Sequence, residues 1–126
     1  MKQEIKDQWT AALRSGEFKQ GASRLRTAEG YCCLGVLCEI AVKEGVIGPA
    51  SQDEHGLYEY PDPHLSDNPE ENDPDRTVHG VLPDAVVKWA GLGDFNPVIH
   101  GLTLADRNDN QGWTFDQLAD LIEREL

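Results

Sequence analysis

Four basic residues gather in a short stretch of an otherwise acidic chain. The chain has 11 lysines and arginines against 23 aspartates and glutamates, and four of the bases fall between positions 14 and 26: Arg14, Lys19, Arg24 and Arg26. Glycines interleaved with them can expose backbone N–H groups, and arginine forks match the geometry of phosphate. The cluster therefore predicts a site for a small anion or nucleotide, although it lacks the spacing of a P-loop.

Two aromatic side chains are the best candidates to stack on a base in such a ligand. Phe18 lies inside the basic stretch, and Tyr58 lies in a segment of alternating residues further along. Trp9 and Trp89 fall on the apolar faces of expected helices, which favours burial. The alternative is that the bases pair with the protein's own surplus acids. The predicted ligand site consists of Arg14, Phe18, Lys19, Arg24, Arg26 and Tyr58.

Three cysteines crowd into the longest uncharged run, residues 31–38. Cys33 falls near an expected helix N-terminus, where the dipole lowers the pKa of a thiol and favours a nucleophile. A catalytic thiol also needs a base, and the four histidines are remote in sequence. The Cys-Cys-x4-Cys spacing is not typical of zinc. We expect the cysteines to pack in the core, with a cysteine-dependent enzyme as the weaker alternative, and we expect no metal or cofactor.

The middle of the chain carries the second charge feature. Residues 53–75 hold nine acids and four prolines but no lysine or arginine. The stretch 57–60 alternates and is expected to pair with 77–81, so that about residues 46–80 form an acidic loop or β-hairpin arm. Such an arm could bind a basic host protein, and its sharpest form would mimic the phosphates of DNA. The prolines argue against a regular ladder of charges.

Composition excludes two broad classes of function. The formal net charge of -12 repels phosphate backbones, so we expect no direct nucleic-acid binding. No stretch approaches the roughly 20 apolar residues that span a bilayer, and the N-terminus lacks the apolar core of a signal peptide. We therefore expect a cytoplasmic protein without membrane contact. An odd number of cysteines fits free thiols in that compartment.

Hydrophobic periodicity predicts the elements that position these residues. Helices are expected over residues 3–15, from 33 or 34 to 44, after Pro83, and over the last dozen residues, where Thr114 and Gln117 form a capping box. Residues 23–27 and 31–33 are interpreted as a short hairpin, and residues 98–100 as a short strand.

The second of these helices is predicted to be the centre of the fold. It is apolar nearly all round, which is typical of a buried helix, and Gly35 on it indicates the close approach of another element or a ligand. The whole chain, residues 1–126, is thus predicted to be a single α+β domain. It would have three to four helices around the buried central helix and one or two short antiparallel β-hairpins.

Several segments in this order suggest a family. Residues 9–21 read WTAALRSGEFKQG, residues 31–38 read YCCLGVLC, and residues 114–123 read TFDQLADLIE, with Leu82-Pro83, Trp89 and Asn108-Asp109 between the last two. This arrangement resembles a family of small proteins of unknown function encoded by tailed bacteriophages and prophages. The resemblance skips residues 46–80. It implies a phage accessory protein in the host cytoplasm and transfers no activity and no catalytic residue.

Three functions follow from the sequence, in order of preference. The first is a non-enzymatic phage protein that binds and sequesters a small anionic ligand, such as a nucleotide-type host defence signal. The second is an acidic inhibitor that binds a host protein through residues 53–75. The third is a cysteine-dependent enzyme that uses Cys33.

Overall fold

The computed structural model describes all residues, 1–126, as five α-helices and two small antiparallel sheets. The α-helices are α1 (Gln3–Arg14), α2 (Cys33–Lys43), α3 (Asp84–Ala90), α4 (Leu104–Asp109) and α5 (Phe115–Glu125). The strands are β1 (Ser51–Gln52), β2 (Tyr58–Pro61), β3 (Thr77–Val78), β4 (Val98–Ile99) and β5 (Leu102–Thr103), and a 3₁₀ turn, η1 (Pro69–Glu71), lies between β2 and β3. The predicted α+β class is confirmed, with one more helix than the three to four expected.

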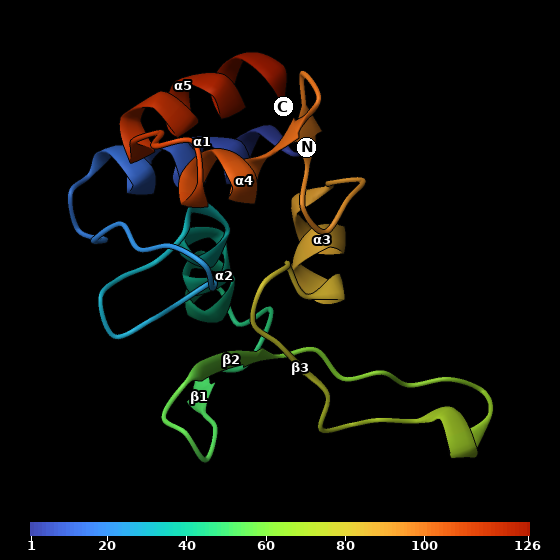
Figure 1. The fold of residues 1–126 in the computed structure, drawn as a ribbon. Helices are drawn as coiled ribbons and strands as arrows, with labels where there is room; N and C mark the ends of the chain where they lie inside the picture. Colours follow the sequence, from blue (N-terminus) through green and yellow to red (C-terminus); the bar gives the residue numbers. More distant parts are fainter.

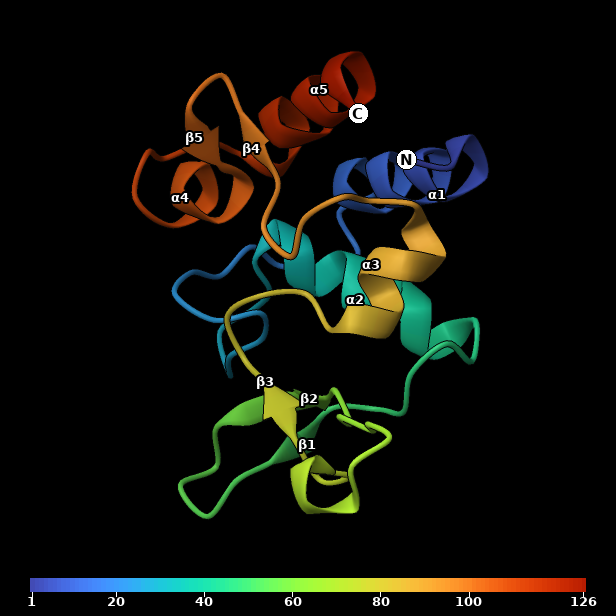
Figure 2. The ribbon, with the colours of Figure 1, turned by 90° about the vertical axis from the view of Figure 1, so that its right-hand side faces the viewer.

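Helix α2 is the buried centre that the sequence predicts. Seven of its 11 residues are buried, and α1, α3 and α4 pack against it (Figure 2). Trp9 on α1 is fully buried and donates a hydrogen bond from Nε1 to the carbonyl oxygen of Cys33 at 2.9 Å. Helix α5 lies along α1, and the two chain termini meet beside them (Figure 1). Helix α1 therefore lies between α5 and α2.

The close approach expected at Gly35 is made by the chain segment that precedes α2. A Cβ added to Gly35 would overlap the carbonyl oxygen of Leu25. Leu25 is itself buried, and its N–H donates to the carbonyl oxygen of His79 at 2.7 Å. Its carbonyl accepts from the N–H of Cys32 at 3.1 Å. Glycine in α2 thus lets this segment lie directly on the central helix.

The hairpin predicted for residues 23–33 forms in a shortened version, over residues 25–32. Residues 15–32, named here the connecting segment, contain no continuous strand, but Arg26 and Tyr31 form an antiparallel bridge, and Thr27 and Gly30 exchange backbone hydrogen bonds of 2.7 and 3.3 Å. Ser23 has a φ of 75°, in the left-handed region, which interrupts an extended strand. Cys33 already belongs to α2. The backbone of Leu25 bonds both across this short hairpin, to Cys32, and across the molecule, to His79.

A three-stranded sheet and an arm occupy the end of the molecule away from α1 and α5 (Figure 1). Strand β2 pairs antiparallel with β3, as predicted for residues 57–60 and 77–81, with Tyr60 opposite Val78. Strand β1 was not predicted, because its two exposed polar residues carry no alternation signal. Residues 62–76 form the acidic arm between β2 and β3, which projects from the body with η1 at its tip.

The C-terminal third follows the sequence predictions closely. Strands β4 and β5 form a small hairpin that leads into α4, and β4, Val98–Ile99, is the short strand expected over residues 98–100. The capping box at Thr114 and Gln117 is present at the start of α5. None of the helices is both long and apolar enough to cross a membrane.

Candidate functional site

Basic and aromatic side chains of the connecting segment meet α2 and β2 at one place. The guanidinium carbon of Arg26 lies 4.2 Å from the ring centroid of Tyr58 and 5.3 Å from that of Tyr31. Arg26 also pairs with Glu39 on α2, at 3.5 Å. Phe18 packs edge-on against Tyr31, with 5.3 Å between the ring centroids. These five residues are named the arginine–tyrosine cluster.

Glu39 fixes the cluster to the central helix. Its Oε1 atom accepts a hydrogen bond from the hydroxyl of the buried Tyr60 at 2.6 Å. Burial, followed by this bond to a carboxylate, raises the pKa of Tyr60, so the phenol stays a donor. Burial and the charge of Glu39 also raise the pKa of Tyr31, against the opposing charge of Arg26. The sequence did not single out Glu39; its only signal is that it is a lone acid on an apolar helix.

Two more residues of the predicted site lie at or near this cluster. Arg24 donates from Nη2 to the carbonyl oxygen of Tyr58 at 3.0 Å, and its Nε atom is buried without a partner. No acid lies within ion-pair distance of Arg24. Lys19 is exposed, and its carbonyl oxygen accepts from the N–H of Tyr31 at 2.8 Å. The structure thus brings together Phe18, Arg24, Arg26 and Tyr58.

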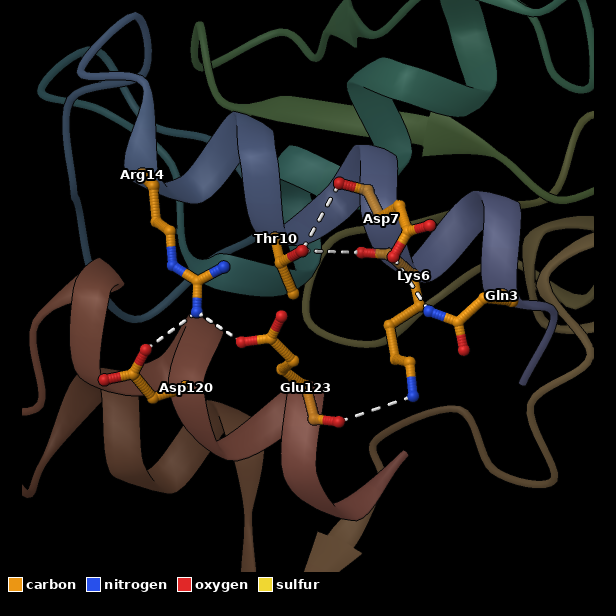
Figure 3. A network of polar contacts seen from close by, with 7 residues as sticks. All are labelled: Gln3, Lys6, Asp7, Thr10, Arg14, Asp120 and Glu123. Carbon is orange, nitrogen blue, oxygen red and sulfur yellow. Dashed lines mark hydrogen bonds and ion pairs between the residues drawn. The ribbon is translucent and has the colours of Figure 1, made fainter.

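Arg14 is directed at another element. Its Nη2 atom lies 2.7 Å from Oδ1 of Asp120 and 2.9 Å from Oε2 of Glu123, both on α5 (Figure 3). Hydrogen bonds to the two carboxylates raise the pKa of Arg14. Nearby, Lys6 donates from Nζ to the carbonyl oxygen of Glu123 at 3.4 Å. Arg14 therefore links α1 to α5, and its role in a ligand site stays a prediction.

Asn108 on α4 holds the connecting segment in place. Its Oδ1 atom accepts from Nε2 of Gln20 at 2.8 Å and from the N–H of Cys33 at 3.3 Å, and its Nδ2 atom donates to the carbonyl oxygen of Gly21 at 2.8 Å. The residue before α2, Cys32, makes no capping bond with its side chain. The buried amide of Asn108 thus satisfies the start of α2 and positions the segment that carries the basic residues.

The three thiols do not form a reactive site. Cys33 and Cys38 have no exposed surface, and Cys32 is 2% exposed. Burial raises the pKa of Cys32 to about 12 and also raises the pKa of Cys33 and of Cys38. The thiols therefore stay protonated near neutral pH and closed to solvent. The expectation that they pack in the core is confirmed.

A cavity of about 250 Å³ opens beside the arginine–tyrosine cluster, between α1 and α2. Phe18 and Glu39 belong both to the cluster and to the cavity wall. Three apolar side chains and five polar ones line the cavity: Ala12, Phe18, Ile40, Gln8, Glu17, Glu39, Lys43 and Glu44. Of the residues that the sequence predicted for a ligand site, only Phe18 lines this cavity.

The tip of the acidic arm is ordered by its own polar side chains. Asn68 accepts from the N–H of Glu70 at 3.2 Å and so caps η1, while the N–H of Ser66 donates to Oδ1 of Asn72 at 2.6 Å. Leu65 is 71% exposed, the largest exposure among the large apolar side chains. The arm exposes five carboxylates that have no basic partner: Asp67, Glu70, Glu71, Asp73 and Asp75.

The base of the arm is fastened to the body through Asp62. This carboxylate is 6% exposed; it accepts from Nη2 of Arg76 at 3.0 Å and from the N–H of Asp84, the first residue of α3, at 2.9 Å. Further along, His64 and Asp73 exchange two backbone hydrogen bonds of 2.8 and 2.7 Å. The arm is therefore a paired hairpin with a charged anchor, and it spans residues 62–76, a shorter stretch than the loop or arm expected over about residues 46–80.

Comparisons with known proteins give one match. The model of a protein family described as "Domain of unknown function (DUF8296)" matches residues 1–126. Neither a curated protein nor a solved structure matches the chain.

Proposed function

The chain belongs to this family of domains of unknown function, and we propose that it is a bacteriophage accessory protein whose acidic arm binds a basic protein of the host. The observation that carries the proposal is the arm itself, which projects from the body and exposes five carboxylates and one leucine (Figure 1). The phage setting rests on the sequence resemblance described above.

The charge of the arm suits a basic surface. Its only arginine or lysine, Arg76, pairs with Asp62, so no lysine or arginine of the arm neutralises the five exposed carboxylates. The net charge of -12 adds to the field and would steer a basic partner toward the molecule. Because the tip is ordered by its own hydrogen bonds, binding would cost less conformational entropy than the ordering of a flexible loop. Leu65 supplies an apolar contact within the charged surface.

The outer part of the arm can be removed without disturbing its base. His64 and Asp73 form a hydrogen-bonded pair that a two-residue Asn-Gly turn would close, so this turn can replace residues 65–72. A photo-crosslinking amino acid at position 65 of the full chain, expressed in bacterial cells, is expected to capture the partner. With that partner purified, the arm-deleted variant and the variant Asp67→Asn, Glu70→Gln, Glu71→Gln should each bind roughly tenfold more weakly or worse.

A matched control separates the arm from net charge. The variant Glu4→Gln, Glu29→Gln, Asp116→Asn removes the same three charges from exposed positions outside the arm and should bind like the unchanged protein at physiological salt. Equal losses in the two triple variants would assign the effect to net charge alone. Undiminished binding by the arm-deleted variant would contradict the proposal.

A second candidate function is the binding of a small anionic, nucleotide-type ligand at the arginine–tyrosine cluster, as the sequence suggested. One observation favours it: Arg24 has no acidic partner, and its buried Nε atom lacks a hydrogen bond beside the Tyr58 backbone. A phosphate group would supply both an anionic partner for the guanidinium and a hydrogen-bond acceptor for the Nε–H group. It ranks second because Arg26 already pairs with Glu39 and Arg14 with α5, so less positive charge is free than the sequence indicates.

Titration calorimetry with linear and cyclic nucleotides tests this second function. Binding is expected to fall at least tenfold in Arg24→Ala, because a charged hydrogen bond to phosphate contributes roughly 1.5–3 kcal/mol. Arg124→Ala, which removes an exposed arginine that forms no ion pair, is the control and should leave binding unchanged. The absence of heat with every nucleotide in the panel would exclude this function and would leave the arm proposal untouched.

A further inference from the structure

The cavity between α1 and α2 combines an apolar wall with a ring of acids. Ala12, Phe18 and Ile40 form the apolar part. Its volume of about 250 Å³ lies below the range of roughly 300–1,000 Å³ that accommodates drug-sized ligands. The size therefore fits a short aliphatic chain with one polar head group.

The charges around the cavity select the sign of that head group. Three glutamates line it against one lysine, which leaves a formal charge of -2 at the opening. Lys43 lies one helical turn after Glu39 but forms no ion pair with it or with any other acid. Arg26, which does pair with Glu39, does not line the cavity. An anion would meet repulsion here, and a cation would be attracted.

Two of the lining side chains are held in place before any ligand arrives. Glu39 is fixed through Oε1 by the hydroxyl of Tyr60 and by Arg26, while its Oε2 atom has no hydrogen-bond or ion-pair partner. The ring of Phe18 is braced by its edge-to-face contact with Tyr31. A fixed carboxylate beside a fixed aromatic ring is the combination that recognises ammonium and guanidinium groups.

We propose that this cavity binds an organic cation: a guanidinium or ammonium group carried on a short aliphatic chain. The chain would lie against Phe18 and Ile40, and the head group would meet Glu39 Oε2 with Glu17 and Glu44 at the rim. The same chemistry has two sources, a free small molecule or an arginine or lysine side chain of another protein. The site is independent of the acidic arm, because no arm residue lines the cavity.

Titration with N-butylguanidinium, followed by two-dimensional NMR and calorimetry, tests the site in the full chain. Its neutral isostere N-butylurea should bind at least tenfold more weakly, because only the cation gains from the carboxylates. The variant Glu17→Gln, Glu44→Gln, in exposed side chains without hydrogen-bond partners, should weaken N-butylguanidinium roughly tenfold. Phe18→Leu keeps the apolar wall without the ring quadrupole and should weaken it roughly threefold.

A control variant tests whether the effect is specific to the cavity, and a peptide ligand tests whether the natural cation is a free molecule or a protein side chain. The variant Glu29→Gln, Glu54→Gln removes two exposed acids away from the cavity and should leave binding unchanged. Equal binding of the urea and the guanidinium, no binding of either, or no effect of Glu17→Gln, Glu44→Gln would overturn the proposal. If acetyl-Gly-Arg-Gly-amide binds tenfold tighter than N-butylguanidinium, the natural cation is a protein side chain; equal or weaker binding assigns a free small molecule.

Discussion

At the scale of single residues, Gly35 decides how closely the connecting segment can lie on α2. Alanine would favour the helix by about 1 kcal/mol, but its Cβ would overlap the backbone carbonyl of Leu25, which no side-chain rotation can relieve. Gly35→Ala is therefore expected to lower the free energy of unfolding by roughly 2 kcal/mol, as measured by urea titration. Gly80→Ala, where the added Cβ meets nothing within 4 Å, should change it by less than about 0.5 kcal/mol. Similar values for both variants would refute the steric argument.

The three cysteines give a second prediction at this scale. Because their thiols are buried and their pKa values are raised, the native protein should react with iodoacetamide at pH 8 on the order of a hundredfold more slowly than the urea-unfolded chain. Mass spectrometry of timed samples measures the rate at each cysteine. If one thiol in the native state were labelled as fast as in the unfolded chain, the cysteine-dependent enzyme would return as a candidate.

At the scale of elements, the order of the arm depends on one buried carboxylate. Asp62 pairs with Arg76 and also accepts the first N–H of α3, which its own N-cap residue, Pro83, cannot satisfy with a side chain. Asp62→Ala should lower the free energy of unfolding by roughly 2 kcal/mol, less than for a fully buried pair, because the Arg76 side chain is 41% exposed. The backbone amides of His64 and Asp73 should exchange hydrogen faster.

Hydrogen exchange read by NMR separates this local effect from global loss of stability. The expected pattern is faster exchange in the arm at urea concentrations where the amides of α2 are still protected. Asp67→Ala, at the exposed tip, is the control and should leave both readouts unchanged. Uniformly faster exchange throughout the chain would show that Asp62 acts on the whole fold rather than on the arm.

Elements that are stabilised by contacts among their own residues could be predicted from the sequence. Segments that are held by hydrogen bonds to residues far away in the chain could not. Helix α5 carries its capping box and apolar face within its own residues, and the apolar residues of α1 and α2 are equally plain in the sequence. The connecting segment instead depends on the carbonyl of His79 and the amide of Asn108, which lie more than 50 residues away. The sequence therefore predicted the local hairpin, of which residues 25–32 form, but could not predict the bonds that fix it to the rest of the molecule.

The candidate site follows the same division. Phe18, Arg24 and Arg26 are close in the chain, so their type and spacing indicated a shared surface, and Tyr58 indeed joins them. The acids that neutralise the bases could not be assigned, because Arg14 meets α5 over 100 residues later and Arg26 meets a glutamate on the far side of the cysteine run. The sequence shows how many acidic and basic residues the chain has, whereas the fold decides which of them form ion pairs.

At the scale of the whole molecule, the buried thiols and phenols make the stability of the fold depend on pH in the alkaline range. In the folded protein, burial raises the pKa of Cys32 from 9.0 to about 12, and the pKa values of Cys33 and Cys38 are raised as well. Below pH 9 both the folded and the unfolded states keep these protons, so the stability they contribute is fully present. Above pH 9 the unfolded chain releases protons that the folded state retains, so the unfolded state binds fewer protons and stability falls as pH rises. The raised pKa values of Tyr31 and Tyr60 extend the decline above pH 10.

The free energy of unfolding is therefore expected to be constant from pH 7 to 8.5 and to fall between pH 9 and 11, with each thiol contributing up to about 1.4 kcal/mol per pH unit. Urea titrations across this range measure the decline.

Repulsion between surface charges in so acidic a protein would also lower the stability as pH rises. In 1 M NaCl the screening length falls to roughly 3 Å, which suppresses this surface repulsion but not the effect of the buried thiols. Cys38→Ala should reduce the slope by one thiol's share whatever its effect on stability at pH 7, because the slope counts protons. A flat profile to pH 10.5 in 1 M NaCl would show that the buried thiols release their protons without unfolding.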